Sequence, residues 1–359
     1  MRIIFFFLVL LTARAGMCQE SLSQVVDQFA GENGFSGVVL VATDGKVDVL
    51  KAVGLSDRET GKAMHTDSKF RIASMTKVFT AVLIMKLVDE NKLALDKPIS
   101  AYFPEYVGDG KDKVTLHHLL TYSSGIENTA DPLGMKSYQT LLTLDEYIAR
   151  YCSGPLVFVP GSESRYGNTE YILLQKIIEK VSGRSFEDNL AEHILGPLQL
   201  RNTGMYKGKN SPQGEVNSYV WDDSLKTLTP DEPYLPEMYF GSGGMYSTAE
   251  DLLAFDQGLF GGKLLSPEST ARLLIIHPEL GYTAYGFWGS EGWGTFSEKF
   301  YYRTGGILGS TSNWIHTIDS KKTILILSNS NQTNLFELSE ALYLMGTKEK
   351  TLTGSGNID

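Results

Sequence analysis

Residues 70–90, FRIASMTKVFTAVLIMKLVDE, decide the fold, because a serine and a lysine stand at the head of a long apolar run. The run predicts a buried helix with Ser74 in its first turn. Lys77 lies three residues further on, so the two side chains project over the same face and can touch. A lysine that burial partly desolvates can take a proton from an alcohol, and the positive end of the helix favours negative charge beside Ser74. Ser74 is therefore a candidate nucleophile, and Lys77 is its candidate activator.

A second element is Tyr166-Gly167-Asn168, within FVPGSESRYGNTEYILL, and it is the only Tyr-x-Asn in the chain. A phenol with an ordinary pKa near about 10 shuttles protons only if nearby cations make its phenolate accessible. Asn168 offers an amide donor and acceptor for a substrate amide or for Lys77. By itself the element equally fits a packed tyrosine and an asparagine at a helix start. The single Ser-x-x-Lys is likewise a pattern expected roughly once by chance.

The third element is Arg303-Thr304-Gly305-Gly306, which ends the β-like run KFYYR and is the only basic residue followed by Thr-Gly. Its glycines would let a strand backbone approach a substrate. The Gly306 N–H could also pair with the Ser74 N–H as an oxyanion hole. The alternative is a plain strand-to-turn junction. The weight of the prediction rests on the three elements together.

In this order the three elements resemble the Ser-x-x-Lys, Tyr-x-Asn and Lys-Thr-Gly motifs of the serine β-lactamase and penicillin-binding superfamily. The resemblance runs from about residue 35 to about residue 330 and includes VTLHHLLTYSSGI, VPGSESRYGN and GSGGMYSTAEDLLAF. The subgroup it resembles contains class C β-lactamases, D-alanyl-D-alanine carboxypeptidases, D-aminopeptidases and esterases. It implies Ser74 as nucleophile, Lys77 as activator, Tyr166 as base and acid, and Asn168 as substrate contact. It also implies an α+β fold, no metal and no organic cofactor.

Two positions depart from that family pattern. Arg303 stands where the family usually has Lys or His, and Tyr122 in LLTYSSG replaces a frequent His. We interpret Tyr122 as structural. The planar fork of Arg303 can hold a carboxylate through two hydrogen bonds, so we expect it to select substrates that carry one. The aromatic stretch GFWGSEGWGTFSEKFYY at 286–302 fits either an acyl pocket or sheet packing, and we favour packing.

Strand patterns lie at both ends of the chain. Residues 36–54, SGVVLVATDGKVDVLKAVG, predict a hairpin at Asp44-Gly45, and residues 311–330 predict two strands around Asp319-Ser320-Lys321. The middle is mainly helical, including NTEYILLQKIIEKVSG, which ends at Gly183, and a helix capped by Thr248. This order predicts a mixed antiparallel sheet with flanking helices built from both chain ends, beside an all-α lobe. We expect a single discontinuous domain at 19–349 with a substrate cleft between the lobes, and a flexible tail at 350–359.

The first residues, MRIIFFFLVLLTARAGMCQE, have the anatomy of a signal peptide, because Arg2 precedes an apolar run from Ile3 to Leu11. That run is shorter than the roughly 20 residues of a spanning helix. We expect a signal peptide at 1–18, with cleavage before Gln19 in preference to cleavage after Ala15 or a lipid anchor on Cys18. The protein would then be exported, either periplasmic or secreted, without a stable membrane span.

Composition and missing motifs argue against several classes of partner and of enzyme. A formal net charge of −10 and a pI near 5.2 argue against nucleic acid as a partner and leave a small molecule or peptide as the substrate. Cys152 is the single cysteine after residue 18 and is expected to be a buried structural thiol. A Ser-His-Asp hydrolase is disfavoured because Gly-x-Ser-x-Gly is absent, and zinc motifs are absent too.

The sequence therefore predicts a serine hydrolase that works through a Ser74 ester, with the scissile bond left open. A D-alanyl peptide, a β-lactam, a D-amino-acid amide and a simple ester all remain candidates. Two alternatives are a small-ester carboxylesterase of the same fold and a binding or sensing domain that does not turn over. The oligomeric state cannot be read from the sequence.

Overall fold

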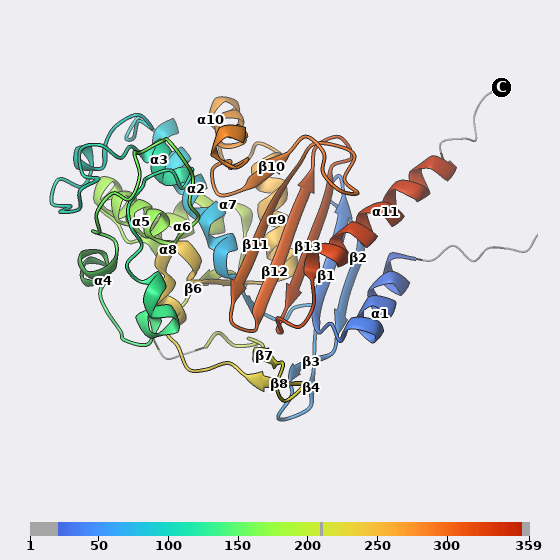
Figure 1. The fold of residues 1–359 in the computed structure, drawn as a ribbon. Helices are drawn as coiled ribbons and strands as arrows, with labels where there is room; N and C mark the ends of the chain where they lie inside the picture. Colours follow the sequence, from blue (N-terminus) through green and yellow to red (C-terminus); the bar gives the residue numbers. More distant parts are fainter. Residues whose placement is uncertain (1–20, 209–210, 354–359) are drawn as a thin grey trace, which may run out of the picture.

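The computed structural model describes residues 21–208 and 211–353 (Figure 1). The expected signal peptide, the cleavage before Gln19 and the alternative lipid anchor on Cys18 lie outside the described residues. At the other end, α11 (Leu335–Thr353) continues into the segment for which the sequence predicts a tail, and residues 354–359 are not described. Within the described ranges, no helix is long and apolar enough to cross a membrane.

A six-stranded antiparallel sheet is assembled from both ends of the chain, as predicted. Its order is β10 (Trp288–Ser290), β11 (Phe300–Ile307), β12 (Ser310–Thr317), β13 (Lys322–Ser328), β1 (Gly37–Thr43) and β2 (Lys46–Val53). The join between the two ends is the β1–β13 pair, whose register runs from Gly37 opposite Ser328 to Thr43 opposite Lys322. The hairpin predicted at Asp44-Gly45 is confirmed, and the two strands predicted around Asp319-Ser320-Lys321 pair as β12 and β13. In the hairpin turn, Asp44 and Gly45 take φ values of 49° and 76°, which a two-residue turn requires.

The central strand β1 is buried on both faces, which explains why it is almost wholly apolar. Val39 and Val41 face a cluster formed with α1 (Leu22–Asn33) and α11, while Val38 and Leu40 face the larger core. In Figure 1, α1 and α11 lie side by side over one face, and α9 (Ala249–Phe260) lies on the other. Thr248 caps α9 by accepting a hydrogen bond from the Asp251 N–H, as predicted.

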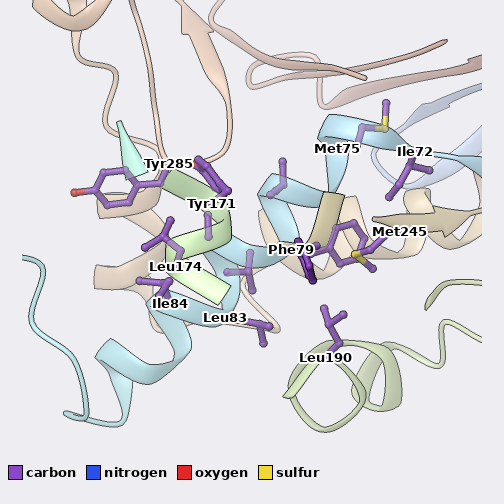
Figure 2. Packing of buried hydrophobic residues seen from close by; sticks show 14 of the residues in the cluster. Ile72, Met75, Phe79, Leu83, Ile84, Tyr171, Leu174, Leu190, Met245 and Tyr285 are labelled. Atoms are coloured by element: carbon purple, nitrogen blue, oxygen red, sulfur yellow. The ribbon is translucent and has the colours of Figure 1, made fainter. Parts of the chain in front are cut away.

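The helical lobe surrounds α2 (Thr76–Asp89), in which eleven of fourteen residues are buried. Burial on every side explains its largely apolar sequence. Figure 2 shows part of the packing, where Phe79 and Leu83 of α2 belong to one cluster with Leu174 of α5 (Thr169–Ser182) and Leu190 of α6 (Phe186–Leu190). The lobe also holds Cys152, which is buried with a free thiol, as expected. The α+β architecture predicted from the sequence is confirmed.

The remaining elements complete the lobe and its junction with the sheet. The other α-helices are α3 (Leu116–Leu120), α4 (Leu144–Tyr151), α5 (Thr169–Ser182), α6 (Phe186–Leu190), α7 (Gly196–Leu198), α8 (Phe240–Gly243) and α10 (Pro267–Leu273). Short 3₁₀ and π turns are η1 (Ala73–Met75), η2 (Ile99–Ala101), η3 (Asp131–Tyr138), η4 (Ala191–Leu195), η5 (Pro236–Tyr239) and η6 (Pro278–Leu280). Small sheets are formed by β3 (Leu55–Asp57) with β4 (Lys62–Ala63), by β5 (Phe70–Arg71), β9 (Met245–Ser247) and β6 (Gly204–Met205), and by β7 (Tyr219–Asp222) with β8 (Thr227–Pro230).

Candidate active site

Ser74 lies at the junction of the two lobes, in the 3₁₀ turn η1 that runs directly into α2. The sequence predicts Ser74 in the first α-helical turn, whereas it occupies this preceding turn. Ala73, just before it, has a φ of 46°, a left-handed conformation that costs energy for a residue with a Cβ. Such strain persists where the surrounding structure imposes it, and here it fixes the direction in which Ser74 points.

Lys77 is fully buried and meets three oxygen acceptors. Its Nζ lies 3.2 Å from Ser74 Oγ, 2.8 Å from Asn168 Oδ1 and 2.8 Å from the Ser242 carbonyl oxygen. Three acceptors match the three N–H groups of an ammonium ion. Burial lowers the pKa of Lys77 to about 8, although the neighbouring Tyr166 phenolate opposes that shift. Lys77 therefore remains protonated at neutral pH but sits close to its titration point.

Tyr166 donates a hydrogen bond from its hydroxyl to Ser74 Oγ over 2.6 Å, and the same hydroxyl accepts one from Arg303 Nη2 over 2.7 Å. Burial of the hydroxyl end favours the neutral phenol, but the positive charges of Arg303 and Lys77 outweigh it and lower the pKa of Tyr166 to about 7. The Lys77 Nζ also lies 4.9 Å from the centre of the Tyr166 ring. Tyr166 can therefore hold a negative charge next to Ser74 near neutral pH.

Arg303 is placed differently from the sequence expectation. Its side chain is completely buried, and its nitrogens donate to the Ser74 carbonyl oxygen at 2.8 Å, to the Tyr122 hydroxyl at 3.0 Å and to Tyr166. Three of the five N–H donors of this guanidinium are thus used inside the protein, and the complete burial of the side chain keeps the other two away from a substrate carboxylate. This placement argues against the expected carboxylate selection by Arg303, because the partners of its side chain belong to the protein.

The β11 residues after Arg303 form the strand edge beside Ser74, because β10 pairs only with residues 300–302 of this strand. Thr304 and Gly306 are exposed, and Gly305 is buried. A Cβ on Gly305 would lie 2.4 Å from the Ile72 carbonyl oxygen, whereas a Cβ on Gly306 would have no heavy atom within 4 Å. The close approach made possible by Gly305 is thus to η1 and not to a substrate. Gly306 stays available as the second N–H of an oxyanion hole.

Four residues to which the sequence analysis gave no role in the site complete its surroundings. The Ser242 carbonyl binds Lys77, the Tyr138 hydroxyl accepts from Asn168 Nδ2 at 3.0 Å, and Tyr122 binds Arg303. Trp288 of β10 covers Arg303, with 4.7 Å between the guanidinium carbon and the ring centre. The aromatic stretch before Arg303 is therefore both sheet packing and site wall. The sequence did carry a signal for Tyr122, because this residue departs from the family pattern.

A cavity of about 170 Å³ lies beside Tyr166 and Gly167. Its lining is mixed, because Ile126, Val157 and Phe158 share it with Glu127, Arg165 and Glu170. Ser74 is not among the residues that line it. Among the described side chains, no three His, Cys, Asp or Glu residues converge in a way that could hold a metal ion.

The arrangement of a serine, a buried lysine and a tyrosine at a sheet edge agrees with a family comparison. The Beta-lactamase family model matches residues 22–345. The chain belongs to the Beta-lactamase family. The esterase EstB of Burkholderia gladioli is 30% identical to it over 283 residues, which cover 70% of this chain and 72% of the esterase.

Two solved structures are similar as well. The octameric penicillin-binding protein homologue of Pyrococcus abyssi is 27% identical, with a TM-score of 0.76 over 90% of this chain and 76% of that one. A D-stereospecific amidohydrolase from a Streptomyces species is 25% identical, with a TM-score of 0.77 over 90% of this chain and 98% of that one. This Beta-lactamase family member thus resembles proteins named for ester and amide hydrolysis and for penicillin binding.

Proposed function

We propose that this protein is a serine hydrolase that cleaves a small ester or amide through an acyl-enzyme on Ser74. One observation carries the proposal: Ser74 Oγ lies 2.6 Å from the Tyr166 hydroxyl and 3.2 Å from the Lys77 ammonium. A nucleophile within hydrogen-bond reach of a base, which other groups orient in turn, is the arrangement needed for covalent catalysis.

Acylation would begin with Tyr166 as phenolate and Lys77 as ammonium, the state favoured near neutral pH. Ser74 Oγ attacks the substrate carbonyl carbon while its proton passes to the Tyr166 oxygen. The backbone N–H groups of Ser74 and Gly306 would stabilise the oxyanion. When the carbon–leaving-group bond breaks, the leaving group takes the proton from Tyr166, and the acyl group remains as an ester on Ser74.

Deacylation would reverse the roles of the same groups. Tyr166, again a phenolate, accepts a proton from a water molecule that attacks the Ser74 ester. The proton then returns to Ser74 Oγ as the acid product leaves. Lys77 stays protonated throughout and holds Ser74 and Asn168 in place. Because one base serves both half-reactions, no second carboxylate base is required.

The substrate class follows from the surroundings of Ser74. A relative named as an esterase and one named as a D-stereospecific amidohydrolase support ester or amide hydrolysis. Since Arg303 is occupied inside the protein, an uncharged small ester is a better first substrate than a D-alanyl peptide or a β-lactam.

We also propose export through residues 1–18 and a single domain spanning 19–349.

The proposal is tested with Ser74→Ala, using a fluorescent fluorophosphonate and hydrolysis of p-nitrophenyl acetate. Ser74→Ala should lose covalent labelling, and its hydrolysis rate should fall by several orders of magnitude. Ser153→Ala, which removes a hydroxyl bonded to the Ile148 carbonyl within the helical lobe, serves as the matched control. Undiminished labelling of Ser74→Ala would contradict the assignment. Labelling of the wild type without release of product would favour the alternative of a domain that binds but does not turn over.

A further inference from the structure

The two departures from the family pattern, Arg303 and Tyr122, touch each other. Nη1 of Arg303 donates to the Tyr122 hydroxyl over 3.0 Å, and both side chains are fully buried. They stand 181 positions apart in the sequence, so each appeared there as an isolated exception. Two exceptions at the two ends of one hydrogen bond point to a matched pair.

Tyr122 is held rigidly in the position that meets Arg303. Its φ of 56° is left-handed, which is uncommon for a bulky side chain and requires support from its surroundings. Its backbone carbonyl accepts a hydrogen bond from the Arg165 N–H over 2.9 Å, and Arg165 directly precedes Tyr166. The Tyr122 and Tyr166 ring centres are 5.0 Å apart. Tyr122 therefore contacts both the Arg303 guanidinium and the segment that carries Tyr166.

The guanidinium itself is enclosed on its two flat faces. Its carbon lies 5.1 Å from the centre of the Tyr166 ring and 4.7 Å from that of Trp288. Its edge donates to Ser74, Tyr122 and Tyr166. With both faces covered, rotation within the plane is the freedom left to the group. The Tyr122 oxygen is the contact that opposes this rotation on the side away from Ser74.

We propose that Tyr122 is a positioning residue of the active site, which fixes the Arg303 guanidinium so that its charge falls on the Tyr166 oxygen. The role rests on the proposed function, because it concerns the phenolate that would act as base. A lysine at position 303 has one nitrogen and cannot reach acceptors placed around a planar fork. The arginine thus depends on the tyrosine, and removal of the tyrosine oxygen should weaken the stabilisation of the phenolate.

The test follows Tyr166 ionisation directly, by ultraviolet difference titration of the phenolate with Tyr166→Phe as the blank. Tyr166 should titrate near pH 7 in the wild type, well below the pKa of the neighbouring Tyr122 and Tyr171, which burial raises. Tyr122→Phe should move this midpoint upward by about half to one pH unit, the size expected for one weakened charge-assisted hydrogen bond. The acid limb of kcat/KM for p-nitrophenyl acetate should move by the same amount.

The matched control is Tyr106→Phe, which also removes a buried phenol with one hydrogen bond, here to the Cys152 carbonyl. It should leave the Tyr166 midpoint unchanged. In an Arg303→Lys background, Tyr122→Phe should add no further shift, because its effect passes through the guanidinium. An equal extra shift in that background would overturn the proposal.

A folded Tyr122→Phe with an unchanged midpoint would also overturn it. If Tyr122→Phe does not fold, Tyr122→Leu, whose side chain has no hydrogen-bond acceptor, should raise the midpoint instead, and an unchanged midpoint in that variant would have the same consequence. The titration does not depend on turnover. A wild type that shows the midpoint but no labelling of Ser74 would refute the proposed hydrolase and leave the role of Tyr122 standing.

Discussion

Substitution of Gly305 by alanine tests whether the closeness of β11 to η1 controls the nucleophile. An added Cβ would lie 2.4 Å from the Ile72 carbonyl oxygen and 2.4 Å from Ser312 Oγ. A carbon and an oxygen that are not bonded normally stay about 3.3 Å or more apart, so the strand and the turn must separate by about 1 Å. Ile72 is two residues before Ser74, and the turn that must move carries the nucleophile.

The expected cost has two parts. Overpacking of this kind destabilises a protein by about 1–3 kcal/mol, which at this chain length lowers Tm by roughly 1–4 °C. A displacement of about 1 Å at the reacting atoms can lower the rate by about a hundredfold. Gly305→Ala should therefore lose far more activity than the change in Tm would suggest.

The assay combines thermal unfolding with kcat/KM for p-nitrophenyl acetate. Gly306→Ala is the control for stability, because its Cβ would have no heavy atom within 4 Å. Its Tm should stay within about 1 °C of the wild type. The reasoning is refuted if Gly305→Ala keeps both the wild-type Tm and the wild-type kcat/KM.

Three further predictions concern titration and coupling. The pH profile of kcat/KM for a neutral ester should be bell-shaped. Its acid limb should lie near pH 7, where Tyr166 gains its proton, and its alkaline limb near pH 8, where Lys77 loses one. A flat profile across both pH values would contradict the mechanism. Lys77→Ala and Tyr166→Phe should each remove most of kcat/KM, and the double variant should lose little more, whereas full additivity would show that the two residues act independently. Burial lowers the pKa of His117 to about 4. The unfolded chain therefore binds a proton near pH 6.5, whereas the folded chain binds it only near pH 4. The free energy of unfolding should fall as the pH drops from 6.5 to 4. His117→Gln should recover about 1–2 kcal/mol at pH 4.5 in chemical unfolding and nothing at pH 7.5; an equal acid loss in this variant would exclude His117 as the cause.

The strands and the turn at Asp44-Gly45 could be predicted because their signals are local. Asp44-Gly45 between two β-rich runs specifies a turn whatever the rest of the chain does. The cap at Thr248 and the stop at Gly183, which has a φ of 71°, are equally local. These features follow from the preferences of a few neighbouring residues.

The role of Arg303 could not be predicted, because it depends on partners distant in the sequence. Arginine chemistry alone allows either a substrate carboxylate or internal acceptors, and the complete burial of its side chain decides between them. The Ser242 carbonyl at Lys77, 165 positions away, carries no side-chain signal at all. Backbone acceptors and buried pairs of this kind emerge only from the tertiary packing.

The pairing of β1 with β13 has a consequence for synthesis. The hairpin of β1 and β2 leaves the ribosome early. The other edge of β1 (Gly37–Thr43), on the side away from β2, finds its partner only in β13 (Lys322–Ser328). An isolated hairpin is marginally stable in water, and contacts so distant in sequence form slowly. Until its partner strand arrives, GVVLVAT is an uncharged, β-rich segment with an open edge, which is the type of sequence that aggregates. Chains that stop before residue 322 should therefore accumulate as insoluble material.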